Sequence, residues 1–145
     1  MARPVPNSGG IAAGLTGEAY RFLRDVKNNA DAVAADVATL QALTYGETFA
    51  IGGSLSNQDY NVLINAPFGF SIASITSKCR SGSCTATFKI GGVSLGGGAN
   101  SVSSSEQTKT HSSANAVAVS DDFTCTISAN SSCIDAVFTI AYTRT

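Results

Sequence analysis

The apolar residues of this chain follow two different periods, and the change between them constrains the fold more than any other feature. Over residues 16–44 they recur at alternating steps of three and four, the period of a helix with one apolar stripe. Over residues 47–145 they alternate with polar residues at every second position, the period of half-buried strands. The sequence therefore predicts one helix followed by a domain that is mainly β.

The helical stretch carries a heptad seam of aliphatic residues. The first position of successive heptads holds Leu23, Ala30 and Val37, and the fourth holds Val26, Val33 and Leu40. Such a narrow stripe favours a short parallel coiled coil between identical chains, because the chain offers no second helix as a partner. A helix lying on a neighbouring sheet is the alternative interpretation.

These patterns divide the chain into three parts. Residues 1–15 are expected to form an extended arm, because Pro4 and Pro6 each push the preceding residue out of the helical region. Residues 16–46 are expected to form the coiled-coil helix, with Thr16 as its N-cap. Residues 47–145 would form the β domain.

The β domain is predicted to be an antiparallel sandwich, jelly-roll-like, of short strands joined by short turns. Turn signals include Ser81-Gly82 and Asn130-Ser131-Ser132. The apolar parity slips between Ile72 and Ile75, as at a bulge or at a strand that changes sheets.

A ribbon rich in serine and threonine follows the glycine run at residues 96–98. We expect residues 101–110 to form a strand that pairs with residues 115–119 after a bend near His111. With hydroxyls on both faces, this strand fits an exposed sheet or a wet contact between chains.

The four cysteines leave two interpretations open. Their spacings do not match the paired motifs of a zinc ribbon. Cys84 and Cys125 take apolar positions in strands where apolar and polar residues alternate, which is typical of buried free thiols. A hairpin turning at Ser81-Gly82 would instead set Cys79 opposite Cys84 and make a disulfide between them possible.

No constellation of residues predicts catalysis, a metal site or a cofactor. The single histidine, His111, is expected on the surface amid hydroxyls, and no nucleophile elbow is present. Asp121-Asp122 lies in a turn, where Asp is common for backbone reasons. We therefore expect no enzyme.

Charge and hydropathy also narrow the expected partners and location. A net charge of −1 provides no strong field for nucleic acid, and no run of 18 apolar residues could insert into a membrane. The N-terminus lacks the apolar region of a secretory signal, so we expect synthesis in a cytoplasm.

Three stretches carry a resemblance to a known class of proteins. They are the turn 88-FKIGGVSLGG-97, the strand 100-NSVSSSEQ-107 and the C-terminal 138-FTIAYTR-144. Over roughly residues 65–145 the chain resembles small virion proteins of tailed bacteriophages and of gene-transfer-agent-like particles. These include head fibres, capsid decoration proteins and short tail fibres.

The resemblance implies a homotrimer in the virion. The arm residues Arg3, Pro4, Val5 and Pro6 would dock on capsid or tail proteins. The seam would join the chains, and the β domains would form an outward knob. A capsid decoration protein or head fibre is the leading hypothesis. A tail fibre or receptor-binding tip that contacts host surface glycan is the second, and an unrelated surface binding module is the third.

Overall fold

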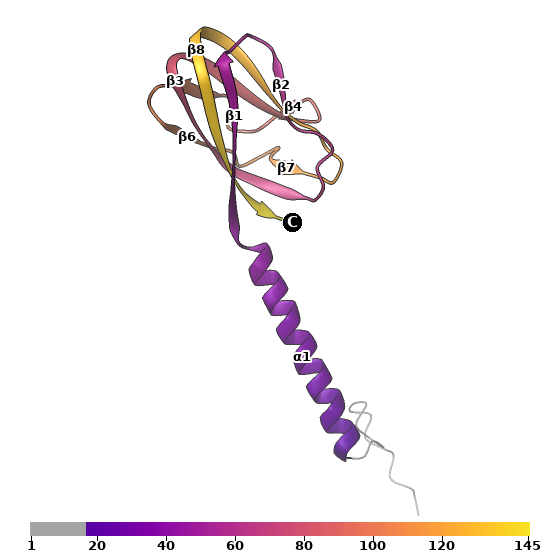
Figure 1. Ribbon diagram of the computed structural model, residues 1–145. Coiled ribbons are helices and arrows are strands. Elements are labelled where there is room, and N and C mark those ends of the chain that lie inside the picture. The colour runs from indigo at the N-terminus through magenta and orange to yellow at the C-terminus, as the bar shows by residue number, and fades with distance from the viewer. Residues whose placement is uncertain (1–16) are drawn as a thin grey trace, which may run out of the picture. The chain divides into compact units, whose positions relative to one another are not determined.

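The computed structural model describes residues 17–145, as one helix and one β-rich unit (Figure 1). Contacts divide the chain into two units between Leu40 and Gln41. Helix α1 spans Gly17–Gln41, and Glu18 in its first turn complements the positive end of the helix dipole. The helix ends earlier than the sequence predicts, because Thr44–Gly46 already pair with the last strand of the sheet.

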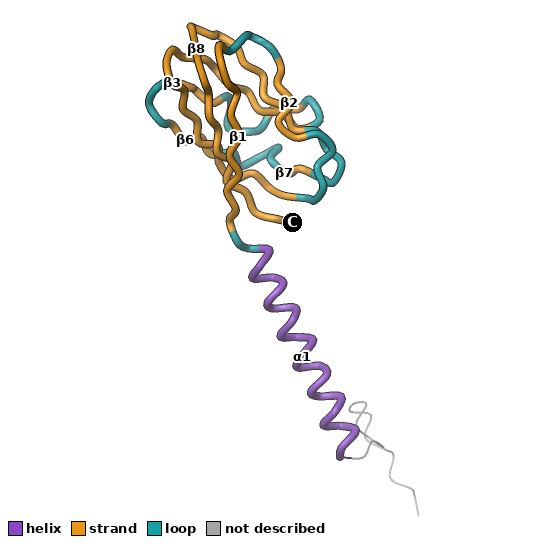
Figure 2. The backbone as a smooth tube through the Cα atoms, viewed as in Figure 1, coloured by secondary structure: helices purple, strands orange, loops and turns teal. Residues whose placement is uncertain are grey.

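The β-unit is a single antiparallel sheet of eight strands (Figure 2). The strands are β1 (Thr44–Ser54), β2 (Asp59–Leu63), β3 (Phe70–Ile90), β4 (Val93–Ser94), β5 (Asn100–Ser103), β6 (Gln107–Thr110), β7 (Ala116–Val117) and β8 (Phe123–Arg144). The two longest, β3 and β8, pair along their length. Strands β1 and β2 pair with β8, whereas β4, β5, β6 and β7 pair with β3. The mainly β fold class is confirmed; the sandwich, the jelly-roll and the coiled coil stay predictions.

Two of the predicted turns are wrong, because β3 and β8 run through them. Ser81-Gly82 lies inside β3 and Asn130–Ser132 inside β8, and the register shifts where these segments face each other. Gly82 has φ +75°, and a Cβ there would lie 2.1 Å from the carbonyl oxygen of Ser132. The glycine therefore permits a close approach of two bulged strands. A bulge of this kind, like many turns, needs a residue that adopts a positive φ.

The parity slip in the first half of β3 is a bulge, as predicted. The register with β8 shifts between Ile72 and Ser74, and both Ile72 and Ile75 are buried. An extra residue on one strand restores the inward direction of the next apolar side chain.

One apolar cluster receives side chains from both halves of the long strands. Ile72 and Phe88, near opposite ends of β3, belong to the same buried cluster as Phe123 and Phe138 of β8. Phe88 stacks on Phe123 with ring centroids 5.6 Å apart and meets Phe138 edge-on at 5.4 Å. The sheet therefore folds over one core, and Figure 1 shows the long strands curving.

The polar ribbon differs from its prediction. Residues 100–110 form two strands, β5 and β6, that pair with separate stretches of β3. Ala116 and Val117 pair with Ser71 and Phe70 of β3, not with the ribbon. β3 is long enough to pair with all of these short strands. The sequence pattern does not reveal that they pair with the same strand.

Candidate self-association surfaces

The heptad seam of α1 lies exposed along the whole helix. Four of its side chains are 45–62% exposed: Leu23, Val26, Val33 and Val37. No residue of the helix is buried. Ala30 and Leu40, the other two seam residues, are exposed as well. Aliphatic side chains in water at heptad spacing are the pattern that a partner helix covers.

Aromatic residues flank the seam near the start of α1. Tyr20 is 50% exposed and Phe22 is 67% exposed, and they occupy the two heptad positions that border the seam. Charged residues also lie on the helix: Lys27 pairs with Asp31 one turn later, and Arg24 contacts Asp25. These exposed ion pairs favour the helix by only a few tenths of a kcal/mol. The arm residues Arg3–Pro6 lie outside the described residues.

A second surface is the outer face of the β-unit, where four threonines line up across four strands. Thr48 of β1 faces Thr139 of β8, Thr139 faces Thr76 of β3, and Thr76 faces Thr108 of β6. The hydroxyl oxygens are 2.9 Å apart in the Thr48–Thr139 pair and 2.7 Å apart in the Thr76–Thr108 pair. We call these residues the threonine row. The sequence does not predict this row, because alternation shows on which face of a strand a residue lies but not which residue of the next strand it opposes.

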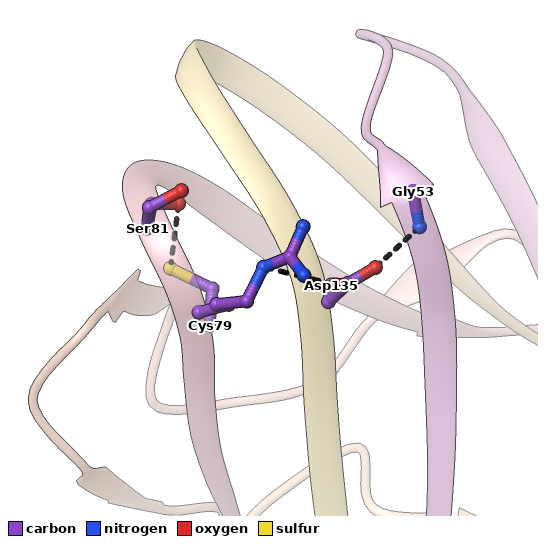
Figure 3. Close-up of polar contacts among 5 residues, drawn as sticks. Gly53, Cys79, Ser81 and Asp135 are labelled. Atoms are coloured by element: carbon purple, nitrogen blue, oxygen red, sulfur yellow. Dashed lines mark hydrogen bonds and ion pairs between the residues drawn. The ribbon is translucent and has the colours of Figure 1, made fainter.

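Beside the threonine row the same face is hollowed into a groove of about 460 Å³. Its walls carry Lys78, Arg80, Glu106 and Asp135. The Asp135 carboxylate accepts a hydrogen bond from the Gly53 amide and lies 3.2 Å from the Arg80 guanidinium (Figure 3). Both signs of charge and several hydroxyls therefore meet in one shallow hollow.

A third surface is an apolar groove of about 390 Å³ between β1 and β2. Phe49, Phe68 and Tyr142 line it, and all three are half-buried. The Arg144 guanidinium lies 4.2 Å from the centre of the Phe68 ring, a cation–π contact at its edge.

The surface position expected for His111 is wrong. His111 is 2% exposed, with Nδ1 2.8 Å from the Gly96 carbonyl oxygen and Nε2 3.1 Å from Asn100 Oδ1. The glycine run packs tightly there, since a Cβ on Gly97 would lie 2.6 Å from the Thr110 carbonyl oxygen. The histidine thus fastens the glycine run to the ribbon, and its nitrogens are occupied by structural contacts.

The four cysteines are buried thiols in this structure. Cys79 and Cys84 lie on the same strand, so the hairpin that would set them opposite each other is not formed. Burial raises the pKa of Cys79 to about 11 and that of Cys125 to about 12, and it also raises the pKa of Cys84 and Cys133. A thiol with such a raised pKa is a poor nucleophile at neutral pH.

Within residues 17–145 no group of three or more His, Cys, Asp or Glu side chains is placed to hold a metal ion. In the same part of the chain no helix is both long and apolar enough to cross a membrane. The three surfaces described above are the seam, the outer β face and the apolar groove.

Comparison with known proteins assigns no family. No family model matches the chain, and no curated protein is similar to it. Among solved structures, a chain of the cyanophage Pam1 capsid asymmetric unit aligns with a TM-score of 0.38 and 14% identity, over 71% of this chain and 84% of that one. A chain from the disulfide-linked pili of Bacillus endospore appendages aligns with a TM-score of 0.36 and 16% identity, over 70% of this chain and 89% of that one.

The N-terminal cellulose-binding domain of a Cellulomonas fimi glucanase aligns with a TM-score of 0.37 and 14% identity, over 69% of this chain and 78% of that domain. The three proteins differ in function, and all three likenesses are low.

Proposed function

We propose that this chain is a non-enzymatic structural protein of a bacteriophage virion that assembles as a homotrimer through α1. The observation that carries the proposal is the exposed seam. Val26 and Val33 are 49% and 62% exposed at heptad spacing. A sister copy presents the same spacing and so provides the matching knobs and holes.

The residue types in the first two heptads of the seam favour more than two helices. Leu23 occupies a first heptad position, whereas β-branched Val26 and Val33 occupy fourth positions. β-Branched residues at the fourth position pack poorly in a parallel dimer, and they shift the preference toward trimers and tetramers. A trimer is the smallest assembly that suits this arrangement.

The seam is short, so we expect other parts of the chain to support the trimer. A helix of 25 residues is roughly 38 Å long at 1.5 Å per residue. The threonine row offers the β-units a flat face of hydroxyls that can exchange hydrogen bonds with a neighbouring copy.

Placement on a virion is supported by the resemblance of residues 65–145 to phage structural modules. A binding role for the arm, through Arg3–Pro6, would attach the trimer to the capsid as a decoration protein or head fibre. Extended proline-containing segments bind with little loss of conformational entropy because their backbone is already restricted.

Particle binding tests this placement. Purified full-length protein, added to particles that lack it, should band with them in a density gradient. A variant without residues 1–14 should keep its oligomeric mass and remain at the top. Equal banding of the two proteins would contradict docking through the arm. Labelling found only at the tail would contradict the capsid placement.

The charged groove on the outer β face favours a second candidate, a tail fibre that contacts host surface glycan. Sugars are bound through hydroxyls and charged side chains, and the groove carries both. Under this alternative, purified protein should block phage adsorption, and Arg80→Ala should weaken the block. A lack of competition at saturating dose would argue against it.

A further inference from the structure

Three of the four cysteines gather where the bulges of β3 and β8 face each other. Cys79 and Cys84 lie on either side of Gly82 in β3, and Cys133 lies in the facing part of β8. Their exposed fractions are 3%, 5% and 0%. The lack of space for a Cβ on Gly82 shows that the two strands approach closely at this point.

Within this cluster Cys133 has a central position. In the register of the two strands Ser81 lies opposite Ile134 and Ser83 opposite Ser131, so Cys133 faces the segment of β3 between Cys79 and Cys84. The sulfur of Cys79 also lies 3.4 Å from the carbonyl oxygens of Ser81 and Gly82, which accept from it. The Cys133 backbone is held on both sides, because its amide donates to Asn130 Oδ1 and its carbonyl accepts from the Leu55 amide.

The two cysteines of β3 are badly placed to bond to each other. Five residues along an extended strand span roughly 16 Å at 3.3 Å per residue, and the bulge removes only part of that length. A disulfide requires Cα atoms within about 7 Å of each other. Neighbouring strands, about 5 Å apart, meet that requirement readily.

We propose that this cluster is the site of one disulfide between β8 and β3, in which Cys133 is the constant partner and Cys79 and Cys84 compete for it. Oxidation leaves one thiol of β3 free. The bond ties the two longest strands together where their bulges interrupt the regular ladder.

A hydroperoxide is the class of oxidant that suits so buried a site, because it is small. With hydrogen peroxide, one thiolate attacks a peroxide oxygen and the O–O bond breaks, which gives a sulfenic acid and hydroxide. The second thiolate attacks the sulfenic sulfur, and the S–S bond forms as a second hydroxide leaves. The two thiol protons convert both hydroxides to water, so the cysteine pair loses the two electrons that the peroxide gains.

Burial determines how fast this reaction runs. Only the thiolate reacts, and burial raises the pKa of Cys79 to about 11 and also raises that of Cys84 and Cys133. The rate should therefore rise about tenfold per pH unit between pH 7 and pH 9. The cluster stays reduced under mild conditions and oxidises under sustained peroxide.

Peptide mapping of the full-length protein tests the proposal. The protein is treated with hydrogen peroxide at pH 8, its remaining thiols are blocked, and it is digested with trypsin without reductant. Cleavage after Lys78, Arg80 and Lys89 separates Cys79 from Cys84. We expect residues 110–144 to be linked to residues 79–80 or 81–89, with fragmentation placing the link at Cys133 rather than Cys125.

Single variants identify the shared partner. Cys133→Ser should abolish the link, whereas Cys84→Ser and Cys79→Ser should each redirect it to the remaining cysteine of β3. Cys125→Ser is the matched control and should leave the link unchanged. The oxidised wild-type protein should melt at least about 5 °C above the reduced form, and Cys133→Ser should show no such rise.

Three results would overturn the proposal. They are a bond between Cys79 and Cys84, a link that survives Cys133→Ser, and recovery of four free thiols after a dose that fully oxidises glutathione in the same tube.

Discussion

His111 illustrates how much a single residue can contribute when its contacts are buried. Its ring joins Gly96 to Asn100, and Asn100 in turn donates to the Ile75 carbonyl oxygen 3.0 Å away. One side chain therefore links the glycine run, β5 and β3.

Replacing His111 with alanine should destabilise the β-unit by about 2–4 kcal/mol, because it removes the buried polar contacts of the ring and leaves a cavity. Urea denaturation followed by circular dichroism measures the change. The exposed neighbour Ser112→Ala is the control and should change the free energy of unfolding by less than about 0.5 kcal/mol. Equal stability of the two variants would contradict a structural role for the ring.

Gly82 gives the sharpest prediction about the backbone. Gly82→Ala combines a left-handed φ with a Cβ 2.1 Å from the Ser132 carbonyl oxygen, so it should cost more than about 3 kcal/mol. Gly52→Ala, where a Cβ meets nothing within 4 Å, should cost far less. The difference in denaturation midpoint between the two variants checks this, and a smaller loss for Gly82→Ala would refute the close approach of the strands.

At the scale of elements, the sequence predicted the character of the chain better than its connections. Alternation placed Phe88, Phe123 and Phe138 correctly on buried faces, because burial of every second side chain is a local property of a strand. It could not separate a turn from a bulge at Gly82, since both favour glycine at positive φ. A strand of 21 residues is also well beyond the usual length of about five or six.

The same limit applies to the sites. The seam positions could be identified from their spacing, because a heptad is visible in one chain. The threonine row, the cysteine cluster and the burial of His111 depend on which strands lie beside β3 and β8. Pairings between residues far apart in the sequence decide that, and no local pattern encodes them.

We expect the helix to join the chains and the β-unit to fold without it. A protein of residues 41–145 keeps the whole buried cluster and should unfold within a few degrees of the full-length chain. It should sediment as a single chain, because the seam has been removed. Differential scanning calorimetry and sedimentation velocity measure the two properties. A truncated protein that still forms trimers would show that the β face, not α1, drives assembly.

For the whole molecule, the account depends on one physical statement: identical chains cover the aliphatic seam of α1. The proposed docking of a trimer on the particle requires that assembly. A chain that remained single would leave several leucine and valine side chains about half exposed to water.

Sedimentation equilibrium of the full-length protein tests this statement most directly. Val26→Asp with Val33→Asp places like charges in each buried layer, whereas Asn28→Asp with Ala35→Asp adds the same charge on the opposite side of the helix. We predict three times the 14.7 kDa chain mass for the wild type and for the second variant, and the mass of one chain for the first. A wild-type protein that sediments as one chain, or a trimer that survives aspartate at Val26 and Val33, would contradict the account.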